Sequence, residues 1–135
     1  MPQVNSTTVS LRFSGGEDHD EIASIIGVTP TRIERKGQPR VHGRKINESG
    51  CWIYSLEFIS PGNLNAQIAK IFEKTTKDNK SWLSLSKKYD AYLFIGIFHE
   101  EINEEIGLSA ETLKCLAERH LRIYFDIYYQ GDCKE

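Results

Sequence analysis

The sequence concentrates cationic side chains in one short segment that could bind an anion. Residues 32–45 hold six Lys and Arg against the single Glu34, a local charge of +5 on a chain whose formal net charge is -2. Guanidinium groups bind carboxylates and phosphates through paired hydrogen bonds. The alternative is a solvated connection whose charges only keep the protein soluble. The candidate binding residues are Arg35, Lys36, Arg40, Arg44 and Lys45.

Two acidic segments contain a histidine and so offer the ligand types that divalent metals use. These are residues 17–21, around His19, and residues 99–105, which begin at His99. The first segment lacks a second, spaced set of ligands and suits the start of a helix. In the second, no histidine follows His99 at the four-residue spacing of a zinc-protease helix. We therefore predict no metal site and no cofactor.

Local motifs for catalysis are missing from the chain. It has no nucleophile elbow, no phosphate-binding loop and no dinucleotide-binding glycine motif. Neither His42 nor His120 has a nucleophile nearby in the sequence. Catalytic sites also assemble from distant residues, so this does not exclude an enzyme. We name no catalytic residue and favour a non-enzymatic role, with the question of an enzyme left open.

Composition and charge narrow the class of protein. The chain has 135 residues, 39% hydrophobic and 27% charged, as expected of one folded domain over residues 1–135. No apolar run approaches the ~20 residues that span a bilayer, and the start does not resemble a signal peptide. The three cysteines are scattered, which argues against a secreted disulfide framework. We expect a cytoplasmic protein that does not contact membranes.

Nucleic acid is a disfavoured partner. The sequence pI is about 6.1, whereas nucleic-acid modules are usually strongly basic. Tyr54, Tyr124 and Tyr128 could offer stacking platforms on a sheet, but the strand signature of RNA-binding modules is missing.

The hydrophobic pattern predicts alternating strands and helices. Strands are expected at residues 7–14, 31–36, 51–59, 91–98 and 121–129, and helices at 18–27, 64–72, about 79–89 and from Ser109 onwards. This order indicates an α+β fold with a ferredoxin-like, split βαβ antiparallel sheet, helices mainly on one face, and an extra C-terminal helix and strand. Residues 91–98 are apolar throughout, which predicts a strand covered on both faces. The expected core includes Trp52, Phe58, Phe94, Ile95, Phe125 and Ile127.

Three short stretches resemble a known bacterial family. They are Gly27-Val28-Thr29-Pro30-Thr31, Lys36-Gly37-Gln38-Pro39 and the later Trp52. In them the chain resembles the family called domain of unknown function 4279, and the likeness covers most of the chain. The resemblance implies a small bacterial protein, but it carries over no catalytic residue and no ligand.

These observations favour a binding or interaction module, immunity-like by analogy, that recognises an acidic protein partner. The basic segment and the neighbouring exposed face of the sheet would form its contact surface. The alternative is a small-molecule-binding protein or enzyme with a pocket between helices and sheet. The sequence leaves the oligomeric state open between a monomer and a weak dimer.

Overall fold

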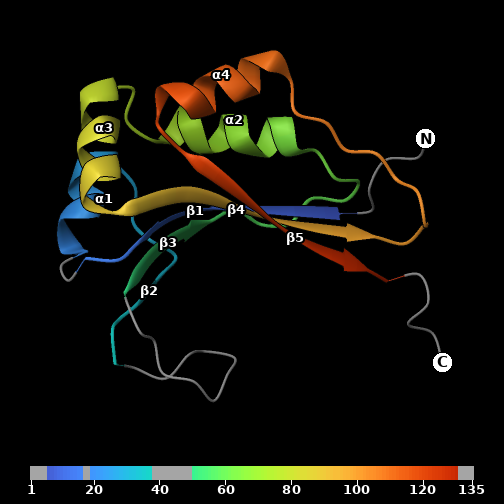
Figure 1. Ribbon diagram of the computed structural model, residues 1–135, viewed down its shortest axis with the longest axis horizontal. Coiled ribbons are helices and arrows are strands. Elements are labelled where there is room, and N and C mark those ends of the chain that lie inside the picture. The colour runs from blue at the N-terminus through green and yellow to red at the C-terminus, as the bar shows by residue number, and fades with distance from the viewer. Residues whose placement is uncertain (1–5, 17–18, 38–49, 131–135) are drawn as a thin grey trace.

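A mixed α/β fold emerges from the computed structural model, which describes residues 6–16, 19–37 and 50–130. Four helices lie on one face of a five-stranded sheet (Figure 1). The elements are β1 (Ser6–Ser14), α1 (Asp20–Ile26), β2 (Arg32–Glu34), β3 (Cys51–Ser55), α2 (Leu64–Lys74), α3 (Asn79–Lys88), β4 (Asp90–His99), α4 (Ala110–Glu118) and β5 (Arg122–Tyr129).

The sheet has the strand order β2-β3-β1-β4-β5. β1 lies at its centre and pairs antiparallel with both β3 and β4, whereas β4 and β5 are parallel. A parallel neighbour requires a crossover connection, and the segment containing α4 supplies it. The prediction of a wholly antiparallel sheet was therefore wrong for β5, and the five-stranded order differs from a simple split βαβ arrangement.

Alternating side chains of the central strands form the core beneath the helices. Val9, Leu11 and Phe13 of β1 are at most 1% exposed, because every second residue of a strand points to the same face. Trp52 is fully buried against Phe13, with ring centroids 5.6 Å apart. Its indole nitrogen finds no hydrogen-bond partner among the residues that the structure describes.

The ends of the helices largely follow the local signals of the sequence. Gly27 ends α1 with a φ of 97°, a left-handed conformation that glycine adopts without strain. The Ser109 side chain accepts from the amide of Thr112 and so caps α4, as predicted. α3 begins at Asn79, as expected, and Asp78 caps it by accepting from the amide of Lys80.

The expected core was right in part. Trp52 and Ile95 are fully buried. Phe58 is 65% exposed, because β3 ends at Ser55 and Phe58 lies beyond it. Phe125 and Ile127 are 48% and 61% exposed, since they lie on the edge strand β5. Phe94 is only half-buried, because it lies on the face of the sheet opposite the helices, so the prediction of a strand covered on both faces holds only for the helix side of β4.

Candidate functional site

The face of the sheet opposite the helices carries most of the side chains that could recognise a partner. Alternation sends every second residue of each strand to this face, and the strand registers place these residues side by side. We call it the open face. It carries Arg32 and Glu34 of β2, Cys51 and Ile53 of β3, Ser10 and Arg12 of β1, Asp90, Tyr92, Phe94 and Phe98 of β4, and Arg122, Tyr124, Asp126 and Tyr128 of β5. Ser10, Cys51 and Ile53 are buried, so a partner could reach only the other side chains of this face.

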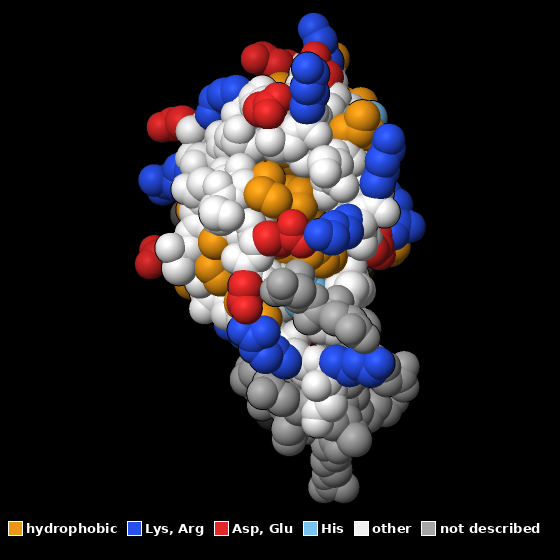
Figure 2. All heavy atoms as spheres, turned by 90° about the vertical axis from the view of Figure 1, so that its left-hand side faces the viewer, with side chains coloured by type: hydrophobic (Ala, Val, Ile, Leu, Met, Phe, Trp, Pro, Cys, Tyr) orange, Lys and Arg blue, Asp and Glu red, His pale blue; other side chains and the backbone are white. Residues whose placement is uncertain are grey.

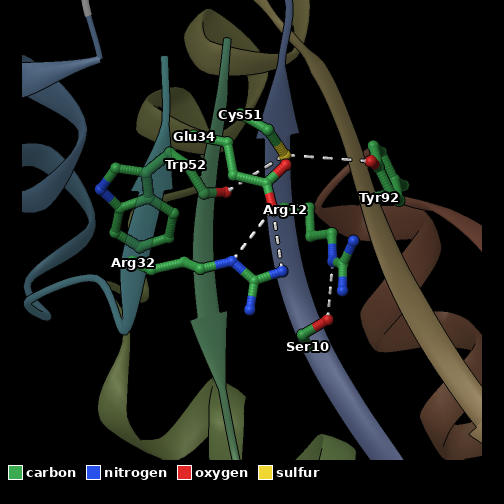
Figure 3. A network of polar contacts seen from close by, with 7 residues as sticks. All are labelled: Ser10, Arg12, Arg32, Glu34, Cys51, Trp52 and Tyr92. Atoms are coloured by element: carbon green, nitrogen blue, oxygen red, sulfur yellow. Dashed lines mark hydrogen bonds and ion pairs between the residues drawn. The ribbon is translucent and has the colours of Figure 1, made fainter. Parts of the chain in front are cut away.

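Arg12 lies at the centre of the open face. It is half-buried and pairs in register with Ile53 on one side and with Tyr92 on the other. Its Nε donates to Ser10 Oγ at 2.9 Å (Figure 3). Its guanidinium carbon lies 4.2 Å from the centroid of the Phe94 ring. No carboxylate forms an ion pair with Arg12 in the described part of the chain. The fold thus holds a cation in place without a described counter-ion.

A thiol and a phenol lie beside this cation. Cys51 Sγ is 4.0 Å from the hydroxyl oxygen of Tyr92, across the width of β1 (Figure 3). Burial raises the pKa of the Cys51 thiol, and burial likewise raises the pKa of the Tyr92 hydroxyl. Arg12 acts in the opposite direction on both groups, but its effect is smaller than that of burial. Both groups therefore stay neutral near pH 7, and Cys51 is not an activated nucleophile.

Aromatic rings of β4 and β5 surround a shallow hollow next to Arg12. Tyr92 and Tyr124 meet edge to face with centroids 5.0 Å apart, and Phe98 stacks on Tyr128 at 4.9 Å. The hollow has a volume of about 540 Å³. It is lined by Asp90, Tyr92, Phe94, Tyr124, Phe125 and Asp126.

The carboxylates at this hollow already have partners. Asp90 forms an ion pair with Arg122, and Asp126 accepts a hydrogen bond from the Tyr128 hydroxyl. This hydrogen bond raises the pKa of Tyr128. The aromatic rings are consequently the main surface that the hollow offers to a ligand.

Of the predicted binding residues, the structure describes only Arg35 and Lys36, which follow β2 in the sequence. Arg35 follows β2 and forms an ion pair with Asp20 at 3.3 Å, while Lys36 is exposed. Arg40, Arg44 and Lys45 lie outside the described residues. Cationic and acidic side chains alternate over the face of the molecule seen in Figure 2. The role of the basic segment stays a prediction.

The acidic segment around His19 has structural partners. His19 is 2% exposed, and its Nε2 donates to the carbonyl of Gly15 at 2.7 Å. Glu21 binds Lys88 and accepts a 2.9 Å hydrogen bond from the Tyr89 hydroxyl, and the bond from Lys88 is the main cause of its lowered pKa. Within the described ranges, no three His, Cys, Asp or Glu side chains form a group that could hold a metal.

Sequence reasoning missed Arg12, Tyr92 and Phe94. The one available signal was the alternation of Ser10, Arg12 and Ser14, which marks the polar side of β1. It could not show that an aromatic ring of β4 lies under the arginine. Of the three tyrosines considered as stacking platforms, Tyr124 and Tyr128 share the open face, whereas Tyr54 packs against the core on the helix side.

Comparison with known proteins gives a family but no activity. The chain belongs to the family described as Domain of unknown function (DUF4279), whose model matches residues 5–130. No curated protein and no solved structure matches the chain. In the described part, none of the helices has the length and apolar character to cross a membrane.

Proposed function

We propose that the protein is a non-catalytic binding module that recognises an acidic segment of a partner protein through the open face. The observation that carries this proposal is Arg12, which is half-buried and has no carboxylate partner among the described residues. A desolvated guanidinium group gains most from a carboxylate that binds both of its terminal nitrogens. A partner's Asp or Glu side chain would supply that carboxylate.

The aromatic hollow would bind an apolar side chain next to this carboxylate. The Phe94 ring contacts Arg12 and also lines the hollow, so the two contacts are adjacent. Interface centres are enriched in Tyr, Phe and Arg, and their strongest contacts are side chains buried in pockets. The expected recognition element is therefore an acidic residue close to an aromatic or aliphatic residue.

The charge of the open face favours a protein over a nucleic acid. Arg12, Arg32 and Arg122 share it with Glu34, Asp90 and Asp126, so it lacks the positive excess that a phosphate backbone requires. Arg35, Lys36, Arg40, Arg44 and Lys45 follow β2 in the sequence. They would attract an acidic partner and raise the association rate. An immunity-like role, with a toxin as the partner, is one form of this proposal.

The alternative is a small ligand in the aromatic hollow. A volume of about 540 Å³ lies within the range of small-molecule sites, roughly 300–1,000 Å³. Such a ligand would depend on the rings of Tyr92, Phe94 and Tyr124, and not on Arg12.

Binding measurements on an array of acidic peptides distinguish recognition of an acidic protein segment from binding of a small ligand. Each peptide carries Asp or Glu beside an aromatic residue and is paired with its Asn or Gln isostere. We expect the wild type to prefer the acidic peptides, with affinity that falls as salt rises. Arg12→Gln should weaken the binding of the selected peptide at least about tenfold, as expected for loss of a charged hydrogen bond of ~1.5–3 kcal/mol.

Arg32→Gln is the matched control, because Arg32 lies on the same face but already pairs with Glu34 at 3.0 Å. It should change the affinity much less. Equal binding of acidic and neutral peptides, or an Arg12→Gln variant that binds as the wild type does, would contradict the proposal.

We also infer that β1 to β4 form a ferredoxin-like unit to which α4 and β5 are added. The antiparallel order β2-β3-β1-β4 supports this inference.

A further inference from the structure

The two edge strands of the sheet differ in how well they are protected against pairing with a strand of another chain. β2 forms one edge and has three residues, two of them charged, which limits pairing with another chain. β5 forms the other edge, has eight residues, and pairs with β4 without a bulge. It contains neither Lys nor Pro, the residues that commonly protect an edge.

β5 also exposes apolar side chains on both of its faces. Phe125 and Ile127 are 48% and 61% exposed on the helix side, and Tyr124 and Tyr128 are 43% and 45% exposed on the open face. A long edge strand with exposed apolar side chains favours pairing with another strand. An added strand would cover side chains on both faces at once.

The backbone of β5 is oriented for such pairing. The amide of Gln130 donates to the carbonyl of His99 on β4. Backbone groups alternate in direction along a strand, so the amides and carbonyls of Ile123, Phe125 and Ile127 point away from β4. Among the described residues, no strand lies beyond β5 to form hydrogen bonds with these amides and carbonyls.

We propose that β5 pairs antiparallel with β5 of a second copy of this chain, about a two-fold axis at Phe125, to form a continuous ten-stranded sheet. This register places Phe125 opposite its own copy and Ile123 opposite Ile127 of the other copy. A two-fold interface must be complementary to itself, and this one matches apolar residues with apolar residues.

The charges of β5 support the same register. On the open face, Tyr124 lies opposite Asp126 of the other copy, so the phenol can donate to the carboxylate. Arg122 then lies diagonally across from that carboxylate, within reach of its long side chain. Moving the axis to Asp126 would place the two Asp126 carboxylates opposite each other, which is unfavourable. Moving it to Tyr124 would shorten the paired segment.

The two-fold axis is perpendicular to the sheet, so both open faces point the same way. The dimer would present two Arg12 sites to one partner, although its formation does not depend on the binding of any partner.

Sedimentation equilibrium of the full chain over a range of concentrations tests the proposal. We expect the wild type to dimerise and Ile127→Lys to weaken the dimer at least about 30-fold, as for the loss of a strong interface contact. Leu113→Lys is the control, because Leu113 is 49% exposed and belongs to α4, outside the strand that would pair. It should leave the dimer intact. Thermal melts should show that both variants fold.

Phe125→Cys tests the register, in a background in which Cys115 and Cys133 are replaced by serine. In a hydrogen-bonded antiparallel pair, the Cα atoms of the two opposed residues lie about 5.5 Å apart, which permits a disulfide between the copies. Oxidation should give a covalent dimer, whereas Leu113→Cys in the same background should not. A monomeric wild type, a dimer that Ile127→Lys leaves unchanged, or the absence of the Phe125→Cys cross-link overturns the proposal.

Discussion

Arg12 and Phe94, on the neighbouring strands β1 and β4, place a guanidinium carbon 4.2 Å from the centroid of a phenyl ring. The ring covers one side of the cation and so separates it from water. Within the described part of the chain, Ser10 is the only side chain that accepts a hydrogen bond from this guanidinium group. This arrangement keeps Arg12 in a fixed position while leaving its strongest type of partner, a carboxylate, to be supplied from outside.

The contact between Arg12 and Phe94 should contribute measurably to stability. In a double-mutant cycle with Arg12→Met and Phe94→Leu, we expect a coupling of ~0.5–1 kcal/mol, the range of a cation beside an aromatic ring. Urea unfolding of the four proteins measures it. The pair Arg122 and Tyr124, at 5.5 Å and more exposed, should give a smaller coupling. Strictly additive effects at Arg12 and Phe94 would show that the contact contributes nothing.

Trp52 should be among the most sensitive positions of the core. The side chain is fully buried and contacts Phe13, so Trp52→Ala should lower the free energy of unfolding by ~3–5 kcal/mol. Phe58→Ala is the control: Phe58 is 65% exposed, and its removal should cost under ~0.5 kcal/mol. Comparable losses in the two variants would disagree with the burial described for β3.

Gly96 allows β4 to approach the side chain of Thr8. A Cβ atom at Gly96 would lie 2.5 Å from Thr8 Oγ1 and 3.3 Å from the ring of Phe98. Gly96→Ala should therefore destabilise the protein by ~1–3 kcal/mol, the usual cost of overpacking. Adding Thr8→Ala should restore part of this loss, because it removes the closer of the two atoms.

Gly107→Ala serves as a control, since no atom among those described lies within 4 Å of its added Cβ. Its effect on stability should be small. A double variant at Thr8 and Gly96 whose losses simply add would argue against the close approach of these strands.

The raised pKa of Cys51 predicts a contribution to stability that weakens at alkaline pH. The unfolded thiol ionises at a lower pH than the buried one, so the folded state binds the proton more tightly. The contribution is complete below the pKa of the unfolded thiol and declines as pH rises through that of the folded thiol. Cys51→Ala should thus reduce the loss of stability between neutral and alkaline pH.

Urea titrations of the wild type and Cys51→Ala at a series of pH values measure this difference. Cys115→Ala is the matched control, because Cys115 is only partly buried. Alkylation of Cys51 at neutral pH should also be slow, and rapid alkylation in the folded protein would contradict its burial. Parallel pH curves for the wild type and Cys51→Ala would contradict the raised pKa.

The sequence alone indicated where helices and strands lie and which side chains share a face of each strand. A period of two along residues 7–14 and 121–129 is a local property, and so is the left-handed turn that Gly27 permits. These signals correctly separated Arg12 from Phe13, and Tyr124 from Phe125. They depend only on neighbouring residues, which is why they could be read without the fold.

The tertiary structure decided which of these sides is covered and which residues of distant strands meet. Phe125 is apolar like the buried Ile95, with which it pairs in register. It is nevertheless exposed, because β5 is two strands away from β1, on which α2 packs. Arg12 likewise meets Phe94 only because β1 and β4, 76 residues apart from Ser14 to Asp90, lie side by side. Burial and ion pairing depend on these long-range contacts, and local patterning does not encode them.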